Sequence, residues 1–244
     1  MEPIDGIEVH IKPEHSRIGI NLSGGTDSAL VVILTCMQIM KHNMINQKTI
    51  VPMTGIEVNR PYNIDAAEKI LEIIKRKFPK VQFGEHVSFQ YNVPKDVHGE
   101  QRGYLKGKAH RESELKLFNS GEIDVVYAGI SRNPPWKDLP EDHPIRKKRE
   151  KNRETDNGYL EKWLYGGMHE RHIKLWYHRP LYAHDKRKVC EMYYKLDLMN
   201  DIFPLTESCI GQAEATNFFT EPCKKCWWCH EKKWAFGLYD GAVV

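Results

Sequence analysis

A short apolar strand runs directly into a glycine-rich loop near the N-terminus, and this junction constrains the fold more than any other feature. Residues 17–22 read RIGINL, which is typical of a buried strand, and residues 23–28 read SGGTDS. Residues 29–40 read ALVVILTCMQIM and are almost wholly apolar. A helix this apolar is buried on all sides, which favours a sheet that is covered by helices.

The alternation of strand and helix patterns continues along the chain. Further strand or helix patterns occupy residues 48–53, 63–78, 81–91, 112–118, 124–130 and 180–198. Pro52 is expected near the end of its strand, where a missing N–H matters least. The order predicts an α/β fold, Rossmann-like, with a parallel sheet flanked by helices and a ligand crevice at the carboxyl ends of the strands.

The loop after the first strand has the chemistry of a phosphate cradle. Gly24 and Gly25 allow the backbone to turn sharply and approach a ligand, and the following helix presents free N–H groups and a positive dipole end. A carboxylate at Asp27 fits beside phosphates if Mg²⁺ bridges the two. Hydroxyl donors come from Ser23, Thr26 and Ser28. An ordinary strand-to-helix turn with a capping side chain is the alternative.

The strand, the loop and the apolar helix together resemble the PP-loop ATP pyrophosphatases, whose SGGxDS pattern is matched at every fixed position. The resemblance implies that residues 23–28 bind ATP and that Asp27 takes part in catalysis. An oxygen of the substrate attacks the α-phosphorus, and pyrophosphate leaves into the loop. A nucleophile, often ammonia or a sulfur donor, then displaces AMP.

A cysteine cluster near the C-terminus has the spacing of a metal site. Thirteen, two and two residues separate Cys209, Cys223, Cys226 and Cys229. Overlapping C-x-x-C steps favour four thiolates around one tetrahedral Zn²⁺ in a structural role, because a closed shell leaves no open position. An iron–sulfur cluster is the main alternative. Cys36 and Cys190 lie in apolar stretches and are interpreted as core residues.

Three further segments extend the resemblance to a narrower family. They read PLYAHDKRKVCEMYYKL, TESC and CKKCWWCHEKKWAF, over residues 180–196, 206–209 and 223–236. With the SGGTDS loop they resemble the 7-cyano-7-deazaguanine synthases of the queuosine pathway, the QueC-like family. The resemblance implies an adenine nucleotide alpha hydrolase-like fold, ligation of zinc by the four cysteines and a catalytic role for Lys186. A solvated lysine beside Arg187 and Lys188 is the alternative for Lys186. It also implies a carbon–nitrogen ligase that converts a carboxyl-deazaguanine into a nitrile with ammonia and ATP.

The middle of the chain differs from that family. Residues 131–136 read SRNPPW where the family continues with Y-P-D-C-R. We expect Arg132 and Asn133 to pair with the edge of a base and Trp136 to stack on its face, although a purely structural loop is equally compatible with these residues. The expected regions are a nucleotide-binding core over 1–133, an insertion or lid over 134–178 and C-terminal helices with the zinc site over 179–244.

Net charge gives no support for a nucleic-acid-binding protein, and hydropathy argues against a membrane protein. The net charge of +3 is too small to indicate a nucleic-acid partner. The run RKKREKNR over 146–153 is strongly basic and is interpreted chiefly as a solvated loop. No apolar run is long enough for a membrane span, and the N-terminus lacks secretory features, so a cytoplasmic location without membrane association is expected.

Three alternatives to the ligase stay open. A PP-loop sulfurtransferase would thiolate tRNA, with cysteines as catalytic residues and the basic run on RNA. A PP-loop protein that binds nucleotide without turnover is another, although an intact Asp27 argues against it. Nucleic-acid binding through the zinc site is disfavoured, because the aromatic residues around the cysteines are as well explained by packing. The expected partners are the deazapurine substrate and ammonia, and a homodimer is compatible with the sequence.

Overall fold

One sheet runs through the part of the chain that the computed structural model describes, which comprises residues 2–59, 63–94, 97, 99–147, 153, 161–165, 174–211 and 213–242. Its strand order is β3-β2-β1-β5-β7-β6. Strand β4 also pairs directly with β2, further along β2 than the residues that pair with β3. The pairs are parallel, except that β6 runs antiparallel to β7. The strands are β1 (Arg17–Asn21), β2 (Thr49–Glu57), β3 (Gln82–Phe83), β4 (Val87–Tyr91), β5 (Val125–Ala128), β6 (Glu161–Tyr165) and β7 (Lys174–His178).

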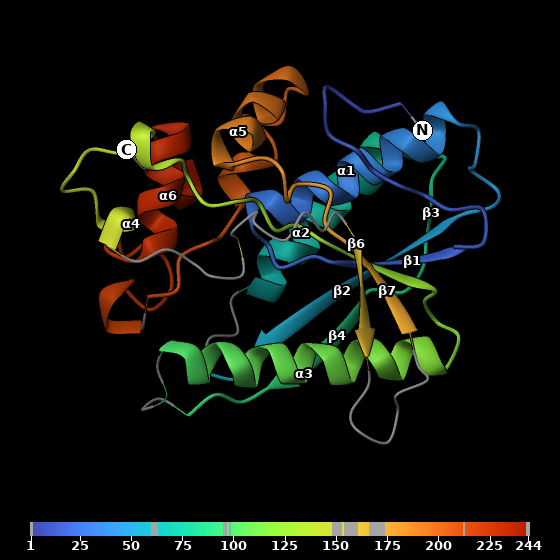
Figure 1. Cartoon of the computed structure of the whole chain (residues 1–244), viewed down its shortest axis with the longest axis horizontal. Helices are drawn as coiled ribbons and strands as arrows, with labels where there is room; N and C mark the ends of the chain where they lie inside the picture. The colour runs from blue at the N-terminus through green and yellow to red at the C-terminus, as the bar shows by residue number, and fades with distance from the viewer. Residues whose placement is uncertain are drawn as a thin grey trace.

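Helices cover both faces of this sheet, with α3 on one side and α1, α2 and α5 on the other (Figure 1). The larger core cluster joins Ile18 and Ile20 of β1 to α1, α2 and α5, and the smaller cluster joins Val126 of β5 to Leu115 of α3. The helices are α1 (Thr26–Lys41), α2 (Asn63–Lys77), α3 (Gly99–Asn119), α4 (Pro144–Lys147), α5 (Lys186–Lys195) and α6 (Trp227–Phe236). The prediction of an α/β fold with a parallel sheet flanked by helices is confirmed.

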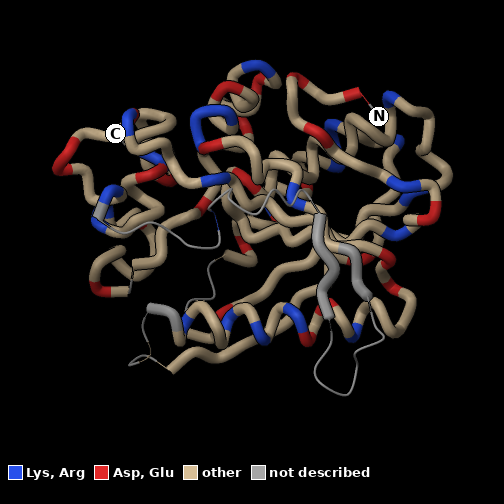
Figure 2. The backbone as a smooth tube through the Cα atoms, in the orientation of Figure 1, with Lys and Arg blue, Asp and Glu red and all other residues tan. Residues whose placement is uncertain are grey.

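The two longest helices differ in how they meet the sheet. Twelve residues of α1 are buried, and its only charged residues are Asp27 and Lys41 at its two ends. Charged residues of both signs follow the whole length of α3 instead (Figure 2). The apolar helix is therefore enclosed, as its sequence predicts, whereas α3 covers the opposite face and keeps a solvated side.

The order in which successive strands are added to the sheet reverses at β1. It crosses from β1 through α1 to β2 on one side, and β5 later pairs with the other side of β1. At such a switch point the loops after two adjacent parallel strands separate and leave a crevice at their carboxyl ends. The loop after β1 and the residues after β5 open on this crevice.

Several elements differ from the sequence expectation. Pro52 lies in the middle of β2, where it pairs with Ile20 of β1. On its other side β2 pairs with β3 through residues 49–50 and with β4 through residues 53–57, so Pro52 falls in the gap between them. A strand tolerates proline at this place because no neighbour there needs its N–H.

Four further differences concern the expected elements. The strand expected over 81–91 is divided into β3 and β4, and α3 extends well before the expected helix at 112–118. Segment 134–178 contributes β7 to the main sheet beside β5. The helix expected over 180–198 begins only at Lys186, where the Asp185 side chain accepts the N–H of Arg187 as a cap.

None of the helices within the described ranges combines the length and the apolar character that crossing a membrane requires.

Candidate functional site

The glycine-rich loop forms a tight junction between β1 and α1. Gly24 adopts a φ of 80°, and a Cβ there would lie 3.0 Å from the carbonyl oxygen of Asn63, so glycine is required. The hydroxyl of Ser28 accepts the N–H of Ser23 at 3.1 Å and donates to the carbonyl of Gly25 at 3.0 Å. These bonds hold the loop in a fixed turn above the first residues of α1.

The start of α1 is pressed against the end of the neighbouring strand. A Cβ at Gly129, just after β5, would lie 2.5 Å from the carbonyl carbon of Asp27 and 2.5 Å from the nitrogen of Ser28. Only glycine permits this approach. The helix N-terminus is therefore located directly at the crevice between β1 and β5.

Asp27 is held by two hydrogen bonds from distant parts of the chain. Nζ of Lys186 lies 2.6 Å from its Oδ1, and the hydroxyl of Ser131 donates to its Oδ2 at 2.9 Å. Burial acts to raise the pKa of Asp27, but the positive charges of Lys186 and Arg153 and these hydrogen bonds hold that pKa below its usual value. The carboxylate is therefore ionised, and Lys186 also lies 3.3 Å from the hydroxyl of Thr26.

Arg153 and Glu231 complete the charged surroundings of Asp27. Arg153 donates through Nη2 to the hydroxyl of Ser131 at 2.8 Å and to Glu231 at 2.5 Å. The second carboxylate oxygen of Glu231 lies 3.8 Å from Nζ of Lys186. Arg153 is buried, so the expectation of a solvated basic run does not hold at this residue, and residues 148–152 lie outside the described part of the chain.

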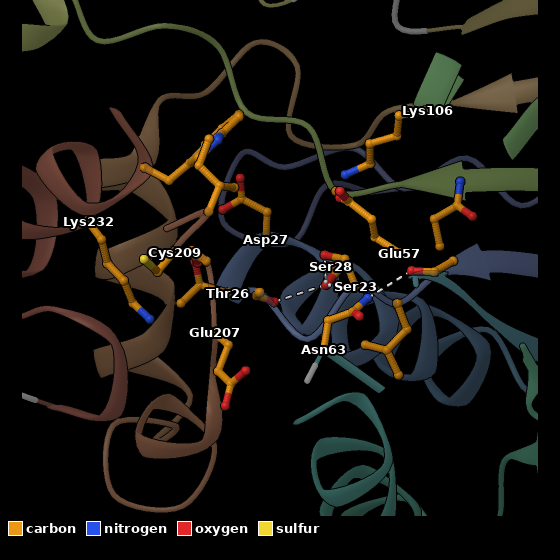
Figure 3. A pocket seen from close by; sticks show the side chains of 18 of the residues that line it. Ser23, Thr26, Asp27, Ser28, Glu57, Asn63, Lys106, Glu207, Cys209 and Lys232 are labelled. Carbon is orange, nitrogen blue, oxygen red and sulfur yellow. Dashed lines mark hydrogen bonds between the residues drawn. The ribbon is translucent and has the colours of Figure 1, made fainter. Parts of the chain in front are cut away.

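Asp27, Lys186 and Glu231 border a cavity of about 300 Å³. Figure 3 shows the loop residues on one side and Glu57 and Lys106 on another, with Glu207, Cys209 and Lys232 closing a further side. Most of the predicted nucleotide-binding residues line it, namely Ser23, Gly25, Thr26, Asp27 and Ser28, together with Lys186. The predicted catalytic pair and the predicted phosphate loop thus share one cavity.

Glu207 and His110 on the cavity wall also have shifted pKa values. Burial raises the pKa of Glu207 to about 7, and the nearby carboxylate of Asp240 adds to this. Burial lowers the pKa of His110 to about 3, so its ring is neutral at physiological pH. A carboxyl group with a raised pKa and a neutral imidazole on a cavity wall are features of functional sites. Glu207 belongs to the TESC segment but is not among the predicted site residues, and His110 stands in no motif of the sequence.

The four cysteines of the C-terminal segment converge as predicted. The sulfur atoms of Cys209, Cys223, Cys226 and Cys229 all lie within 4.8 Å of one another, and those of Cys223 and Cys229 are 3.9 Å apart. Bonds of about 2.3 Å from one tetrahedral Zn²⁺ require sulfur separations of about 3.8 Å. Backbone N–H groups of Gly211 and Cys223 point at the sulfur of Cys209, at 3.3 and 3.2 Å, which suits a thiolate.

The cysteine cluster is joined to the phosphate loop through the T-E-S-C turn. The N–H of Glu207 donates to the carbonyl of Gly24 at 2.8 Å. The carboxylate of Asp240 accepts the N–H groups of Ser208 and Cys209 at 2.8 and 2.7 Å and pairs with the buried ammonium of Lys232. Cys209 therefore lies both in the cluster and on the cavity wall.

The three predicted base-recognition residues do not line this cavity. Asn133 is buried, and its N–H donates to the carbonyl of Arg153 at 3.2 Å. The N–H of Arg132 donates to the carbonyl of His184 at 2.8 Å. Trp136 is 49% exposed, and the guanidinium of Arg146 lies 5.8 Å from the centre of its ring. Ser131 links this segment to Asp27.

Comparison with known proteins gives no family assignment. No protein-family model matches the chain, and no curated protein matches it in sequence. Among the solved structures that match, the U34-tRNA thiolase NcsA from Methanococcus maripaludis, which carries a 4Fe–4S cluster, is 11% identical with a TM-score of 0.44, covering 90% of this chain and 64% of that one. FMN adenylyltransferase from Candida glabrata, in complex with FMN and the ATP analog AMPCPP, is 12% identical with a TM-score of 0.43, covering 84% and 58%.

The chain therefore spans less than two thirds of the length of either structure. Identities and TM-scores this low carry no argument about what the chain binds or does.

Proposed function

We propose that the chain is an ATP-dependent adenylating enzyme whose loop at residues 23–28 receives pyrophosphate. The observation that carries this proposal is the meeting of three groups at one cavity: the N-terminus of α1, the carboxylate of Asp27 and the ammonium of Lys186. Backbone N–H groups and a lysine favour an anion, whereas the carboxylate requires a cation between itself and phosphate. Magnesium pyrophosphate satisfies both requirements.

The chain's own residues have defined tasks in such a reaction. A carboxylate oxygen of the substrate bonds to the α-phosphorus, and the bond from that phosphorus to the departing pyrophosphate breaks. Negative charge grows on the pyrophosphate, where Lys186 and the N–H groups of α1 stabilise it. Asp27 is ionised and would hold Mg²⁺, which when bound neutralises phosphate charge.

We further propose that the acid is a deazapurine carboxylate and that ammonia is the nucleophile. The support is the resemblance of residues 180–196, 206–209 and 223–236 to the QueC-like family. Ammonia attacks the acyl carbon, AMP leaves and an amide forms, and a second adenylation on the amide oxygen followed by loss of AMP and two protons yields the nitrile. Arg132, Asn133 and Trp136 do not line the cavity, so base recognition by these residues is not part of this proposal.

For the cysteine cluster we propose a structural zinc ion. Four thiolates around a cluster of four irons each bind a different iron, so their sulfur atoms lie farther apart than around one ion. Separations within 4.8 Å fit the single ion. A closed site of this kind cannot also relay a persulfide, which disfavours the tRNA sulfurtransferase alternative.

Product analysis tests the proposal. The full chain is incubated with ATP, Mg²⁺, ammonium and 7-carboxy-7-deazaguanine, pyrophosphate release is measured, and products are identified by mass spectrometry. Amide or nitrile formation supports the full proposal, and pyrophosphate without either product would leave adenylation standing but remove this substrate. Sulfur incorporation into tRNA would support the thiolase alternative. Nucleotide binding without pyrophosphate release would indicate a non-catalytic protein.

A further inference from the structure

A closed ring of polar side chains links the phosphate loop to the helix that follows the cysteines. Lys186 contacts Oδ1 of Asp27 at 2.6 Å and lies 3.8 Å from Oε2 of Glu231. The other oxygen of Glu231 contacts Arg153 at 2.5 Å, and Arg153 donates to the hydroxyl of Ser131 at 2.8 Å. Ser131 donates to Oδ2 of Asp27 at 2.9 Å, which closes the ring.

The charges in this ring balance and are nearly excluded from solvent. Its two cations and two anions have side chains that are 14% exposed at Asp27, 7% at Lys186, 5% at Arg153 and 1% at Glu231. Removal of one member of a buried ion pair leaves an uncompensated charge, which is strongly unfavourable. The four side chains therefore fix one another's positions, although they come from four separate segments of the chain.

The metal site reaches this ring through the first turn of α6. Trp227 and Trp228 stand between Cys226 and Cys229, and Cys226 is the N-cap residue of α6. The guanidinium of Arg153 lies 4.7 Å and 5.4 Å from the centres of the two indole rings. Helix α6 also carries Glu231, the carboxylate in the ring of polar side chains, two residues after Cys229. A metal ion bound by the cysteines thus fixes the start of α6. It thereby positions the two indole rings beside Arg153 and the carboxylate of Glu231.

We propose that Arg153 and Glu231 are positioning residues that couple the cysteine metal site to the phosphate loop. The inference rests on the proposed function, since it assumes that the loop binds pyrophosphate. With the metal in place, Glu231 orients Lys186 directly, and Arg153 orients Asp27 through Ser131. Coupling between two binding sites is reciprocal, so pyrophosphate bound at the loop also stabilises the metal at the cysteines.

The decisive variant is the double substitution R153M/E231M in the full zinc-loaded chain. Removal of both charges leaves neither buried and unpaired, so the fold is retained. We expect its affinity for magnesium pyrophosphate, measured by titration calorimetry, to fall by about tenfold, a coupling within the usual range. K195M serves as the matched control, because it removes the two ion pairs of the half-exposed Lys195 at the far end of α5, with Asp5 and Glu191, and leaves the ring intact.

The second measurement is the rate of zinc release to a chromogenic chelator, with and without saturating magnesium pyrophosphate. Pyrophosphate is expected to slow release in the parent and in K195M but not in the double variant. An unchanged affinity in R153M/E231M, or equal protection of zinc in the double variant and the parent, would overturn the inference. Failure of the parent chain itself to bind pyrophosphate would instead refute the proposed function.

Discussion

The ammonium of Lys186 lies 2.6 Å from the carboxylate of Asp27, although 159 positions separate the two residues in the chain. Lys186 is the first residue of α5, and the cap at Asp185 fixes where that helix begins. Long side chains in the first turn of a helix point back toward its N-terminus, which here directs the lysine to the phosphate loop. The C-terminal third of the chain therefore contributes to a site whose motif lies at the other end.

The first prediction concerns this pair. Asp27→Asn removes the charge that compensates Lys186 and the proposed ligand of Mg²⁺, so we expect pyrophosphate release to fall at least about a hundredfold, as for other preorganised electrostatic groups. Loss of one partner of a buried pair is also expected to lower the free energy of unfolding by about 3 kcal/mol. Urea denaturation and a pyrophosphate assay measure the two effects.

Asp138→Asn is the matched control for this substitution. Asp138 pairs with Arg187, the neighbour of Lys186, but the Arg187 side chain is 50% exposed. Ion pairs of this kind contribute no more than about 1 kcal/mol, so both stability and activity should stay near the parent values. Parent-like turnover by Asp27→Asn would contradict the assignment of the loop.

The features predictable from the sequence are those encoded within short segments. The strand, glycine loop and apolar helix at residues 17–40 are contiguous, so their pattern alone predicts the junction. The convergence of four cysteines follows from spacing for the same reason, because three of them lie within seven residues. Each prediction required only local geometry and the chemistry of the side chains.

The parts that were missed depend on contacts between distant segments. Arg153 belongs to a basic run, and its burial arises from Glu231, 78 positions away. Strand β7 is stabilised by pairing with β5, which no local pattern indicates. Helix α3 contains Gly103 and Gly107, which lower helix propensity and obscure its first half.

The second prediction is a pH dependence of stability that arises from Glu207. Burial raises the pKa of Glu207 to about 7 in the folded chain, against an ordinary value of 4.5. The folded chain therefore favours the protonated form of Glu207. Ionisation of Glu207 lowers the free energy of unfolding progressively as pH rises from 4.5 to 7, and above pH 7 this loss stays constant. Glu207→Gln removes this cost.

Thermal unfolding at two pH values measures the effect. We expect Glu207→Gln to stabilise the chain at pH 8 by at least about 1 kcal/mol more than at pH 5, from the linkage of one group with a raised pKa. Glu221→Gln changes a carboxylate outside the cavity and should show no such difference. A gain that is larger at pH 5 would contradict the assigned shift.

The third prediction concerns the identity of the metal. The purified chain is expected to contain one zinc ion and no acid-labile sulfide, because sulfur atoms within 4.8 Å fit a single tetrahedral ion. Cys223→Ser should release zinc and lower the melting temperature, since binding energy at a structural zinc site contributes to folding. Cys190→Ser, a buried cysteine of α5 outside the cluster, should retain zinc fully. Iron with sulfide in the parent chain would refute the zinc assignment.

The fourth prediction tests the contact between β5 and the start of α1. A Cβ at Gly129 would lie 2.5 Å from backbone atoms of Asp27 and Ser28, which cannot move without displacing the phosphate loop. Gly129→Ala should therefore destabilise the chain by about 3 kcal/mol and weaken pyrophosphate binding in the same variant. Gly103→Ala is the control, because a Cβ there meets nothing within 4 Å and α3 should gain about 0.5–1 kcal/mol. If Gly129→Ala binds pyrophosphate as tightly as the parent, the position of the loop does not depend on this contact.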